Sequence, residues 1–343
     1  MNLTVVRIIV LLTFALSILS LPGCLSQSKE QVIVFSALDR EFSKPVFDRL
    51  QQETNIQILA KYDTESTKTV GLANQILQAE EPAACDLFWN NELLHTLRLE
   101  NAGKLDSLPP EVLEQFPPGL QSSSGKWVGL AARGRVIIYN RQLTGGKQLP
   151  TTIEDLVDPQ WKGKCCIAKP LFGTTATHFA ILYQDWGAEK FGQFVEQLKE
   201  NEVGILSGNR QVAADVGAGK YLFGFTDTDD YEVERLAGSP VGLIWPEQQE
   251  TQTGAILLPN TICVPKNAAH RQNALVLLQR IVDGRIEQDL ASGPSIQLPL
   301  RKGLEDAAPD LFRDPTPKWH SIQWSQTVEA WEQSSEILKQ AFY

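Results

Sequence analysis

The chain has 343 residues, of which 43% are hydrophobic, and its formal net charge is −10. This length allows two domains, or one large two-lobed unit, with a hydrophobic core in each part. An acidic protein repels phosphate backbones, so the charge argues against nucleic acid as a partner.

The first residues of the chain predict export from the cytoplasm. Arg7 precedes the apolar run IIVLLTFALSIL, which is the layout of a signal peptide. The run leads into LPGC, which ends at Cys24 and resembles the lipobox of bacterial lipoproteins. That resemblance implies that residues 1–23 are removed, that a lipid on Cys24 anchors the protein to the membrane, and that residues 24–30 form a tether. Pro22 is unusual in such a box, and an ordinary signal peptide cut nearby is the alternative. In both cases we expect a periplasmic or cell-surface protein.

Strand-like and helix-like segments alternate from residue 31 onward. The predicted strands are Val32–Phe35, Ile56–Leu59, Asp86–Trp89, VIIY from Val136, CCIA from Cys165, YLFGF from Tyr221, VGLIW from Val241 and TICVP from Thr261. The predicted helices include Ser43–Thr54, with Ser43 as its N-cap and Pro45 in its first turn, Thr69–Ala79, and a C-terminal packing helix in WSQTVEAWEQSSEILKQAF. This order predicts an α/β fold with mixed, mainly parallel sheets and right-handed crossovers.

The predicted fold has two lobes, and no low-complexity linker separates them in the sequence. We therefore expect the chain to cross between the lobes more than once, along strands that serve as a hinge. Lobe 1 is predicted at residues 31–129 plus 254–305, and lobe 2 at residues 130–253 plus 306–343.

Four cysteines follow Cys24 in the sequence, namely Cys85, Cys165, Cys166 and Cys263. No pair has the spacing of a metal finger, and adjacent cysteines rarely bond each other. Because Cys85 and Cys263 lie in apolar, strand-like contexts, we expect buried free thiols.

The common catalytic motifs are absent from the sequence, which contains neither G-x-S-x-G nor H-E-x-x-H. The four histidines are scattered singly, and the run from Asp227 has Glu232 where a calcium loop needs Gly. We therefore expect a protein that is not an enzyme. The alternatives are an interaction protein and a secreted hydrolase that uses two carboxylates, because any two acids can meet in a fold.

Polar residues cluster where several predicted strands end. The candidate ligand-binding residues there are Asp39, Glu65, Lys68, Asn91, Glu92, Asp227, Asp229 and Asp230, with Thr174 and Asn209 at two loop-to-helix starts. In open α/β sheets, ligands bind outside the carboxyl ends of strands, where helix N-termini converge. Helix capping and turns use the same residue types. However, the three aspartates exceed what one cap needs, and they would repel unless a cation offsets them.

Three segments of the sequence resemble a known protein family. KWVGLAARGRVIIYN from Lys126, LPTTIEDLVDPQWKGK from Leu149 and ILSGNRQVAADVGAGK from Ile205 are similar, in this order, to bacterial periplasmic binding proteins that capture ferric iron for ABC importers. The similarity runs over residues 30–310. It implies a type II, two-lobed fold that closes on its ligand.

The resemblance also implies a set of metal ligands. Tyr139 matches a tyrosine that supplies a phenolate to iron. In the iron binders a later strand ends in paired tyrosines, whereas here the pair falls on Asp229 and Asp230, and Tyr231 is the next residue. The implied metal set is therefore Tyr139, Asp229, Asp230 and Tyr231.

The function implied by the resemblance is a membrane-tethered solute receptor for an ABC importer, without a cofactor of its own. Arg133 and Arg135 lie in the stretch that offers positive charge to an anion accompanying the iron. Ferric iron, a hard cation that prefers anionic oxygen donors, is the first ligand expected. Because carboxylates replace phenolates, a small cationic or zwitterionic organic solute is the alternative. The expected partners are the permease, the ligand and, through the lipid, the membrane, and we expect a monomer.

Overall fold

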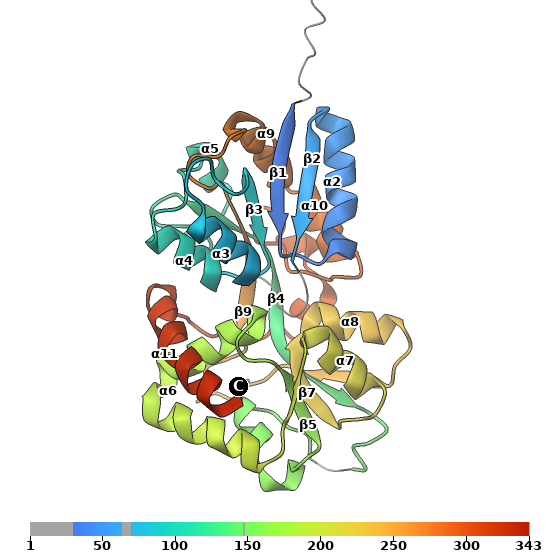
Figure 1. Ribbon diagram of the computed structural model, residues 1–343. Coiled ribbons are helices and arrows are strands. Elements are labelled where there is room, and N and C mark those ends of the chain that lie inside the picture. The colour runs from blue at the N-terminus through green and yellow to red at the C-terminus, as the bar shows by residue number, and fades with distance from the viewer. Residues whose placement is uncertain (1–29, 64–69, 147, 343) are drawn as a thin grey trace, which may run out of the picture. The chain divides into compact units, whose positions relative to one another are not determined.

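The computed structural model describes residues 30–63, 70–146 and 148–342. The predicted signal peptide, the lipidated Cys24 and nearly all of the tether lie outside the described residues. Figure 1 shows the strands in the middle of the described chain, with helices packed around them. Within those ranges, no helix combines the length and the apolar character needed to cross a membrane.

Three parallel strands form the first part of the sheet. β1 (Gln31–Ser36) lies between β2 (Gln57–Tyr62) and β3 (Leu87–Asn90) and pairs with both. The connecting segments contain α2 (Arg40–Thr54) and α3 (Val70–Gln78). Parallel neighbours need such crossovers, and the crossovers leave the carboxyl ends of the three strands at one edge of the sheet.

A second set of parallel strands comes later in the chain. β5 (Cys165–Ala168) lies between β6 (Gly204–Leu206) and β7 (Phe223–Asp227). The connecting helices are α6 (Gly173–Glu200) and α7 (Asn209–Gly217), and α8 (Thr228–Leu236) begins directly after β7. The starts of these helices therefore lie beside the carboxyl ends of the strands that precede them.

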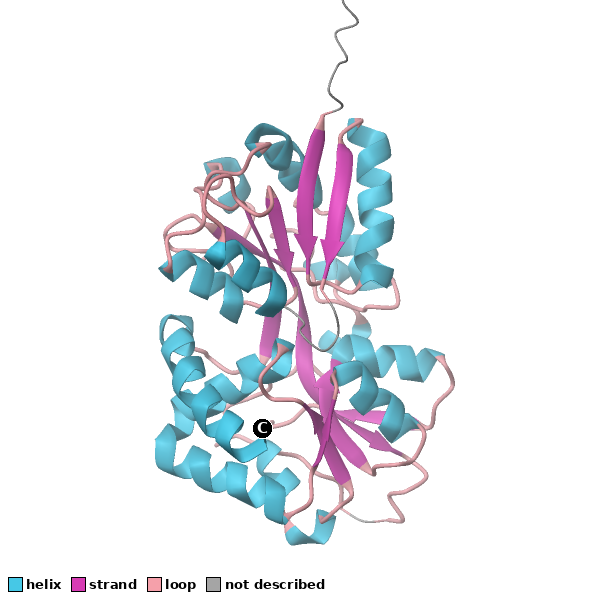
Figure 2. Cartoon of the chain, viewed as in Figure 1, coloured by secondary structure: helices cyan, strands magenta, loops and turns pink. Residues whose placement is uncertain are grey.

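Two central strands, of which the first is long, join the two parallel sets (Figure 2). They are β4 (Trp127–Asn140) and β9 (Leu257–Cys263), in the order β2-β1-β3-β9-β4-β7-β5-β6, and β8 (Val241–Ile244) pairs with β4. β4 pairs with β9 up to Gly134 and with β7 from Arg135 onward. The mixed α/β prediction is confirmed. Parallel pairings make up half of the total, because β4 and β9 run against all their neighbours.

The remaining elements pack on the sheet or connect its strands. They are α4 (Leu94–Asn101), α5 (Pro110–Leu113), α9 (Arg271–Ile281), α10 (Arg285–Ser292), α11 (Trp324–Phe342) and the 3-10 helices Ile153–Val157, Pro159–Trp161, Glu305–Ala307 and Asp310–Phe312. α11 packs against α6 and α4 and buries Val328 and Leu338. The predicted C-terminal packing helix is therefore confirmed.

The apolar residues of the described chain form several buried clusters, and the largest cluster of each strand set is called its core. Val34, Trp89 and Ile262 belong to the first core, and Phe179 and Phe225 belong to the second. β4 contributes buried residues to both cores, so it is the physical link between them. The four described cysteines are buried and form no disulfide, which confirms the expected free thiols.

The start of α2 differs from the prediction. The helix begins at Arg40 after Asp39, so the N-cap predicted at Ser43 is wrong. Ser43 is buried inside the helix, where its Oγ donates to the carbonyls of Leu38 and Asp39 at 3.1 and 3.0 Å. Pro45 therefore lies within the helix and not in its first turn.

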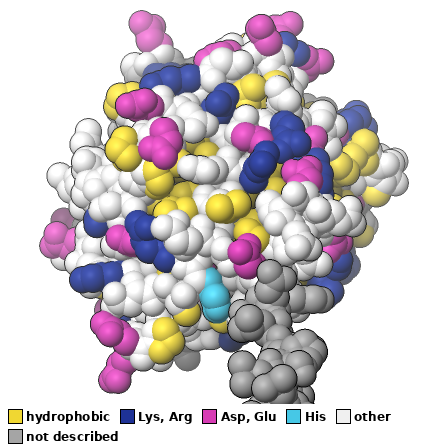
Figure 3. Space-filling view, turned by 90° about the horizontal axis from the view of Figure 1, so that it is seen from above, with side chains coloured by type: hydrophobic (Ala, Val, Ile, Leu, Met, Phe, Trp, Pro, Cys, Tyr) yellow, Lys and Arg dark blue, Asp and Glu magenta, His cyan; other side chains and the backbone are white. Residues whose placement is uncertain are grey.

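Charged side chains of both signs are interspersed on the face shown in Figure 3. Exposed ion pairs of this kind include Arg49 with Asp289 at 2.6 Å and Arg285 with Glu53 at 3.3 Å. Such exposed pairs contribute little to stability, because water and salt screen them. The stability of the fold therefore depends mainly on its buried apolar clusters.

Candidate functional site

Three aspartates lie together where β7 ends and α8 begins. Asp227 is the last residue of β7, and Asp229 and Asp230 lie in the first turn of α8. All three are buried, and they offer one carboxylate oxygen each within 4.8 Å of one another. Carboxylates are favoured near a helix N-terminus, but three in so small a volume also repel each other. The surrounding groups must offset this repulsion.

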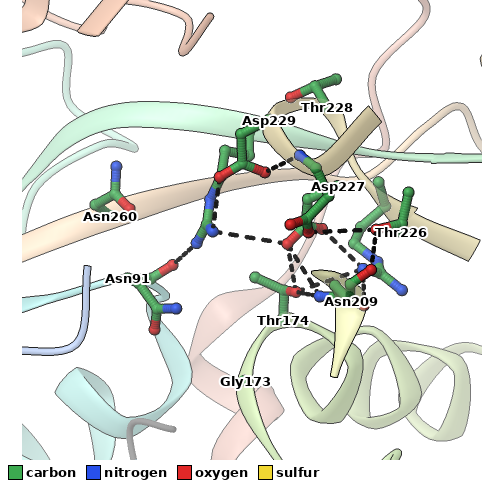
Figure 4. Close-up of polar contacts among 12 residues, drawn as sticks. Asn91, Gly173, Thr174, Asn209, Thr226, Asp227, Thr228, Asp229 and Asn260 are labelled. Carbon is green, nitrogen blue, oxygen red and sulfur yellow. Dashed lines mark hydrogen bonds and ion pairs between the residues drawn. The ribbon is translucent and has the colours of Figure 1, made fainter. Parts of the chain in front are cut away.

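Arg135 is the main partner of Asp227. The two residues face each other in the antiparallel pair of β4 and β7, and Arg135 Nη1 lies 2.7 Å from Asp227 Oδ1. Thr174 Oγ1 and Asn209 Nδ2 donate to Asp227 Oδ2 at 2.7 and 3.1 Å (Figure 4). Burial raises the pKa of Asp227, but Arg135, Arg133 and Thr174 together bring it below its ordinary value of 3.8. Asp227 is therefore held as a carboxylate.

Arg133 connects the aspartates with the loop that follows β3. Its Nη1 lies 3.3 Å from Asp229 Oδ2 and 3.7 Å from Asp227 Oδ2, and its Nη2 donates to the backbone carbonyl of Asn91. Burial lowers the pKa of Arg133, but the negative charges of Asp229, Asp227 and Asp39 raise it by a larger amount. The pKa therefore lies above its ordinary value, and the guanidinium stays charged. Its Nε is buried without a hydrogen-bond partner in the described part of the chain.

A cavity of about 30 Å³ adjoins these groups. The predicted site residues that line it are Asn91, Arg133, Thr174, Asn209, Asp227 and Asp230. Thr174 and Asn209 lie in the first turns of α6 and α7, where backbone N–H groups have no partner within the helix. The cavity therefore offers carboxylate oxygens together with hydrogen-bond donors, which suits a small charged ligand.

Glu92 follows Asn91, whose carbonyl accepts from Arg133, but the carboxylate of Glu92 contacts other groups of the protein. Its carboxylate accepts hydrogen bonds from Asn90 Nδ2 and from the backbone N–H groups of Leu94 and His95 at the start of α4. Thr177 Oγ1 of α6 donates to it at 2.9 Å. Burial raises the pKa of Glu92, and these donors oppose the rise. The structure thus gives Glu92 the role of capping α4 and of contacting α6.

The structure does not bring Tyr139 and Tyr231 to the carboxylate cluster. Tyr139 lies four residues beyond Arg135 on β4, about 13 Å along the strand. Its ring covers Gly242 so closely that a Cβ there would lie 2.4 Å from Tyr139 Cζ. Tyr231 packs with the apolar residues beneath α8. Burial raises its pKa, and its charged neighbours Arg235, Glu232 and Arg141 modify it.

Thr177 and His178 were not predicted from the sequence, and two predicted residues cannot be placed. Glu65 and Lys68 lie outside the described residues. His178 Nδ1 lies 3.5 Å from Arg135 Nε, and burial, with Arg135, holds the pKa of His178 well below its ordinary value. The ring is therefore neutral and helps to hold Arg135. The available signal was their spacing of three and four residues from Thr174, which places Thr177 and His178 on the same face of α6 as Thr174.

Comparisons with known proteins identify a family for most of the chain. The family model for bacterial extracellular solute-binding proteins matches residues 84–326. The chain is 26% identical over 199 residues to the Fe(3+)-binding periplasmic protein of Serratia marcescens. That match covers 58% of the chain and 57% of the relative, so it spans little more than half of either protein.

Two solved structures have the same fold. Iron-bound HitA from Pseudomonas aeruginosa matches with a TM-score of 0.80 at 21% identity, over 92% of the chain and 100% of HitA. AfuA from Actinobacillus pleuropneumoniae, with exogenous fructose-6-phosphate bound, matches with a TM-score of 0.76 at 16% identity, over 91% of the chain and 98% of AfuA. These matches confirm the predicted two-lobed, type II periplasmic-binding-protein fold.

Proposed function

Because the chain belongs to the family of bacterial extracellular solute-binding proteins, we propose that it is an extracytoplasmic receptor that delivers ferric iron to the permease of an ABC transporter. Two of the similar proteins support the choice of iron, since one is named as Fe(3+)-binding and HitA was solved with iron bound. In this role the protein acts by binding and release, without a catalytic step.

The observation that carries the proposal is the cluster of three buried carboxylates after β7. Fe³⁺ is a hard cation and prefers anionic oxygen donors, which the cluster supplies. Asp229 and Asp230 are the proposed iron ligands. Asp227 already accepts from Arg135, Thr174 and Asn209, so it positions the cluster and holds Arg135.

Arg133 offers a way for the ligand to affect both parts of the sheet. It contacts Asn91 after β3 and Asp229 after β7. Iron that binds Asp229 competes with Arg133 for the same carboxylate, and the displaced guanidinium would then face an accompanying anion. A ligand that contacts both lobes favours the closed arrangement, because it binds that arrangement more tightly than the open one. The closed form is what the permease would recognise.

Thermal melting of the purified full-length chain tests this proposal. A ligand that binds only the folded state stabilises it by about 2.7 kcal/mol at a hundredfold excess over Kd, which shifts Tm by several degrees. Ferric citrate should raise Tm, whereas citrate alone and Ca²⁺ should not. An unchanged Tm in ferric citrate would contradict the choice of iron.

A zwitterionic organic solute is the second candidate ligand. The observation that favours it is that carboxylates and the starts of α6 and α7 line one cavity. The carboxylates would bind the positive group of such a molecule, and the helix starts would bind its negative group. Such a solute would raise Tm in the same assay while ferric citrate would not. The two candidates are therefore separated by one experiment.

We further propose that the hinge-linked lobes are residues 31–129 plus 254–305 and residues 130–253 plus 306–343, and that the protein works as a monomer. The crossing of β4 and β9 between the strand sets supports this division.

We also propose that a lipid on Cys24 holds the protein at the membrane. Mass spectrometry of the N-terminal peptide from membranes would detect that lipid, and an unmodified Cys24 would exclude it.

A further inference from the structure

A second, larger cavity lies beside α6, away from the carboxylate cluster. Its volume is about 190 Å³, and its lining shares no residue with that of the smaller cavity described above, although Arg135, the partner of Asp227, lies in its wall. An engineered apolar cavity of about 150 Å³ is large enough to bind benzene. The second cavity can therefore hold a molecule that contains an aromatic ring.

The wall of this cavity is partly apolar and partly polar. Ile181, Leu182 and Trp186 of α6 line one side, and Phe225 and Ile256 come from β7 and the segment before β9. Apolar and aromatic walls with a few placed polar groups are typical of sites for small organic molecules.

Glu247 is placed at the cavity by an unusual backbone conformation. Its φ is 58°, the left-handed region that a residue with a side chain rarely adopts. Two backbone hydrogen bonds hold it there, from Glu247 N to Thr151 O at 2.9 Å and from Gly254 N to Glu247 O at 3.0 Å. Its Oε1 accepts from Ile153 N at 3.1 Å. Backbone strain of this kind persists where the surrounding structure enforces it, and it is frequent at binding sites.

Other titratable side chains line the cavity together with Glu247. Asp185 Oδ2 lies 3.4 Å from His320 Nε2. Glu154 pairs with Lys190 at 2.8 Å, which is closer than the contact of Asp185 with His320, so Asp185 and Glu247 are the carboxylates better placed to meet a ligand. Both line the cavity, together with Glu154 and His320.

His178 supplies an observation that does not depend on these acids. The side chain is only 4% exposed and lines the same cavity. Its Nδ1 faces Arg135 Nε, and because a guanidinium N–H can only donate, the proton of the neutral ring lies on Nε2. No hydrogen-bond partner of Nε2 is found among the described residues. The Nε2–H group of this buried residue is therefore available to an acceptor atom in the cavity.

We propose that this cavity is a binding site for a small organic cation with an aromatic or apolar body, whose ammonium group binds Glu247 and Asp185 and whose hydroxyl or carbonyl oxygen accepts from His178. The inference does not depend on which ligand occupies the carboxylate cluster. It assigns a second ligand to the protein, held by α6 and the segment that precedes β9.

Isothermal titration of the full-length chain with 2-amino-1-phenylethanol tests this site, because the probe has a ring, an ammonium group and a hydroxyl. 1-Phenylethanol, which lacks the ammonium group, is the matched ligand control. Glu247→Gln removes the charge with little change of shape, and Glu250→Gln changes an exposed acid of the same segment. Leu182→Trp fills the cavity, and the double variant Asp229→Ala with Asp230→Ala removes the other site.

The amine should bind at least tenfold more tightly than the alcohol, because a charge-assisted hydrogen bond is lost in the alcohol. Glu247→Gln should weaken the amine at least tenfold, and Leu182→Trp should abolish binding, whereas Glu250→Gln and the double aspartate variant should bind like the wild type. Equal binding of amine and alcohol, or equal effects of Glu247→Gln and Glu250→Gln, would overturn the proposal. Loss of binding in the double aspartate variant alone would also overturn it and would favour an organic ligand at the carboxylate cluster.

Discussion

Thr177 in the first turns of α6 donates a hydrogen bond of 2.9 Å to the carboxylate of Glu92, the residue that caps α4. Glu92 follows β3 of the first strand set, whereas α6 connects strands of the second set. The bond therefore links the two parts of the fold beside the proposed ligand site. Arg133, which reaches from β4 to the carbonyl of Asn91, forms a second link.

Thr177→Val should destabilise the fold, because a buried carboxylate oxygen of Glu92 loses its donor. The expected loss in the free energy of unfolding is about 1–3 kcal/mol. Thr177→Ser keeps the hydroxyl and should recover most of the loss. Urea denaturation at neutral pH measures both, and equal values for Val and Ser would show that the hydrogen bond contributes nothing.

Asp227→Asn should change how stability depends on pH. The pKa of Asp227 is lowered in the folded protein, so the unfolded chain takes up this proton at higher pH than the folded one. The resulting stability is fully present above the ordinary carboxyl pKa and is lost as pH falls through the folded value. Urea denaturation from about pH 6 to about pH 3 should show a steeper loss in the wild type than in Asp227→Asn. Parallel curves would mean that Asp227 does not have a lowered pKa.

Gly134→Ala should displace Trp245 and disturb both neighbouring arginines. A Cβ at Gly134 would lie 2.3 Å from Trp245 Cζ3, a contact that real structures do not contain. We expect a loss of about 1–3 kcal/mol in the free energy of unfolding and weaker ligand binding. Gly192→Ala in α6, where a Cβ meets nothing within 4 Å, is the matched control and should be neutral or stabilising. Equal effects of the two substitutions would show that Trp245 does not restrict this position.

Much of the fold could be predicted, because its strands are short apolar runs with polar residues at their ends. Thr174, Asn209 and Asp227 could be expected to lie close together, because helix starts and strand ends meet at one edge of a set of parallel strands. The start of α2 was predicted wrongly because Phe42 is the single apolar residue of its first turn, and the apolar pattern that signals a helix begins only at Val46.

The partners within the site could not be predicted from the sequence. Arg135 and Asp227 are 92 residues apart, and only the antiparallel register of β4 and β7 places them opposite each other. The separation of Tyr139 from the cluster depends on the same register, because Arg135 and not Tyr139 faces the end of β7. Local patterns show which residue types a strand end carries, but not which distant side chain neutralises them.

Tyr139→Phe should leave ferric binding unchanged within twofold, because the phenol lies along β8 and not at the carboxylates. For the same reason the ferric complex should lack the intense visible colour of an iron–phenolate pair. Absorbance spectra of both proteins with ferric citrate measure this directly. A visible band in the wild type that Tyr139→Phe removes would place Tyr139 in the metal set.

Ferric titration of the double variant Asp229→Ala with Asp230→Ala tests the central claim most directly. Asp310→Ala with Asp314→Ala, which removes two exposed acids of another segment, controls for the change in net charge. Circular dichroism would establish that both variants are folded. If the carboxylates after β7 hold the ligand, the first variant should bind ferric iron at least tenfold more weakly than the wild type, and the control variant should bind it equally well. Wild-type affinity in the folded Asp229→Ala, Asp230→Ala protein would contradict the account.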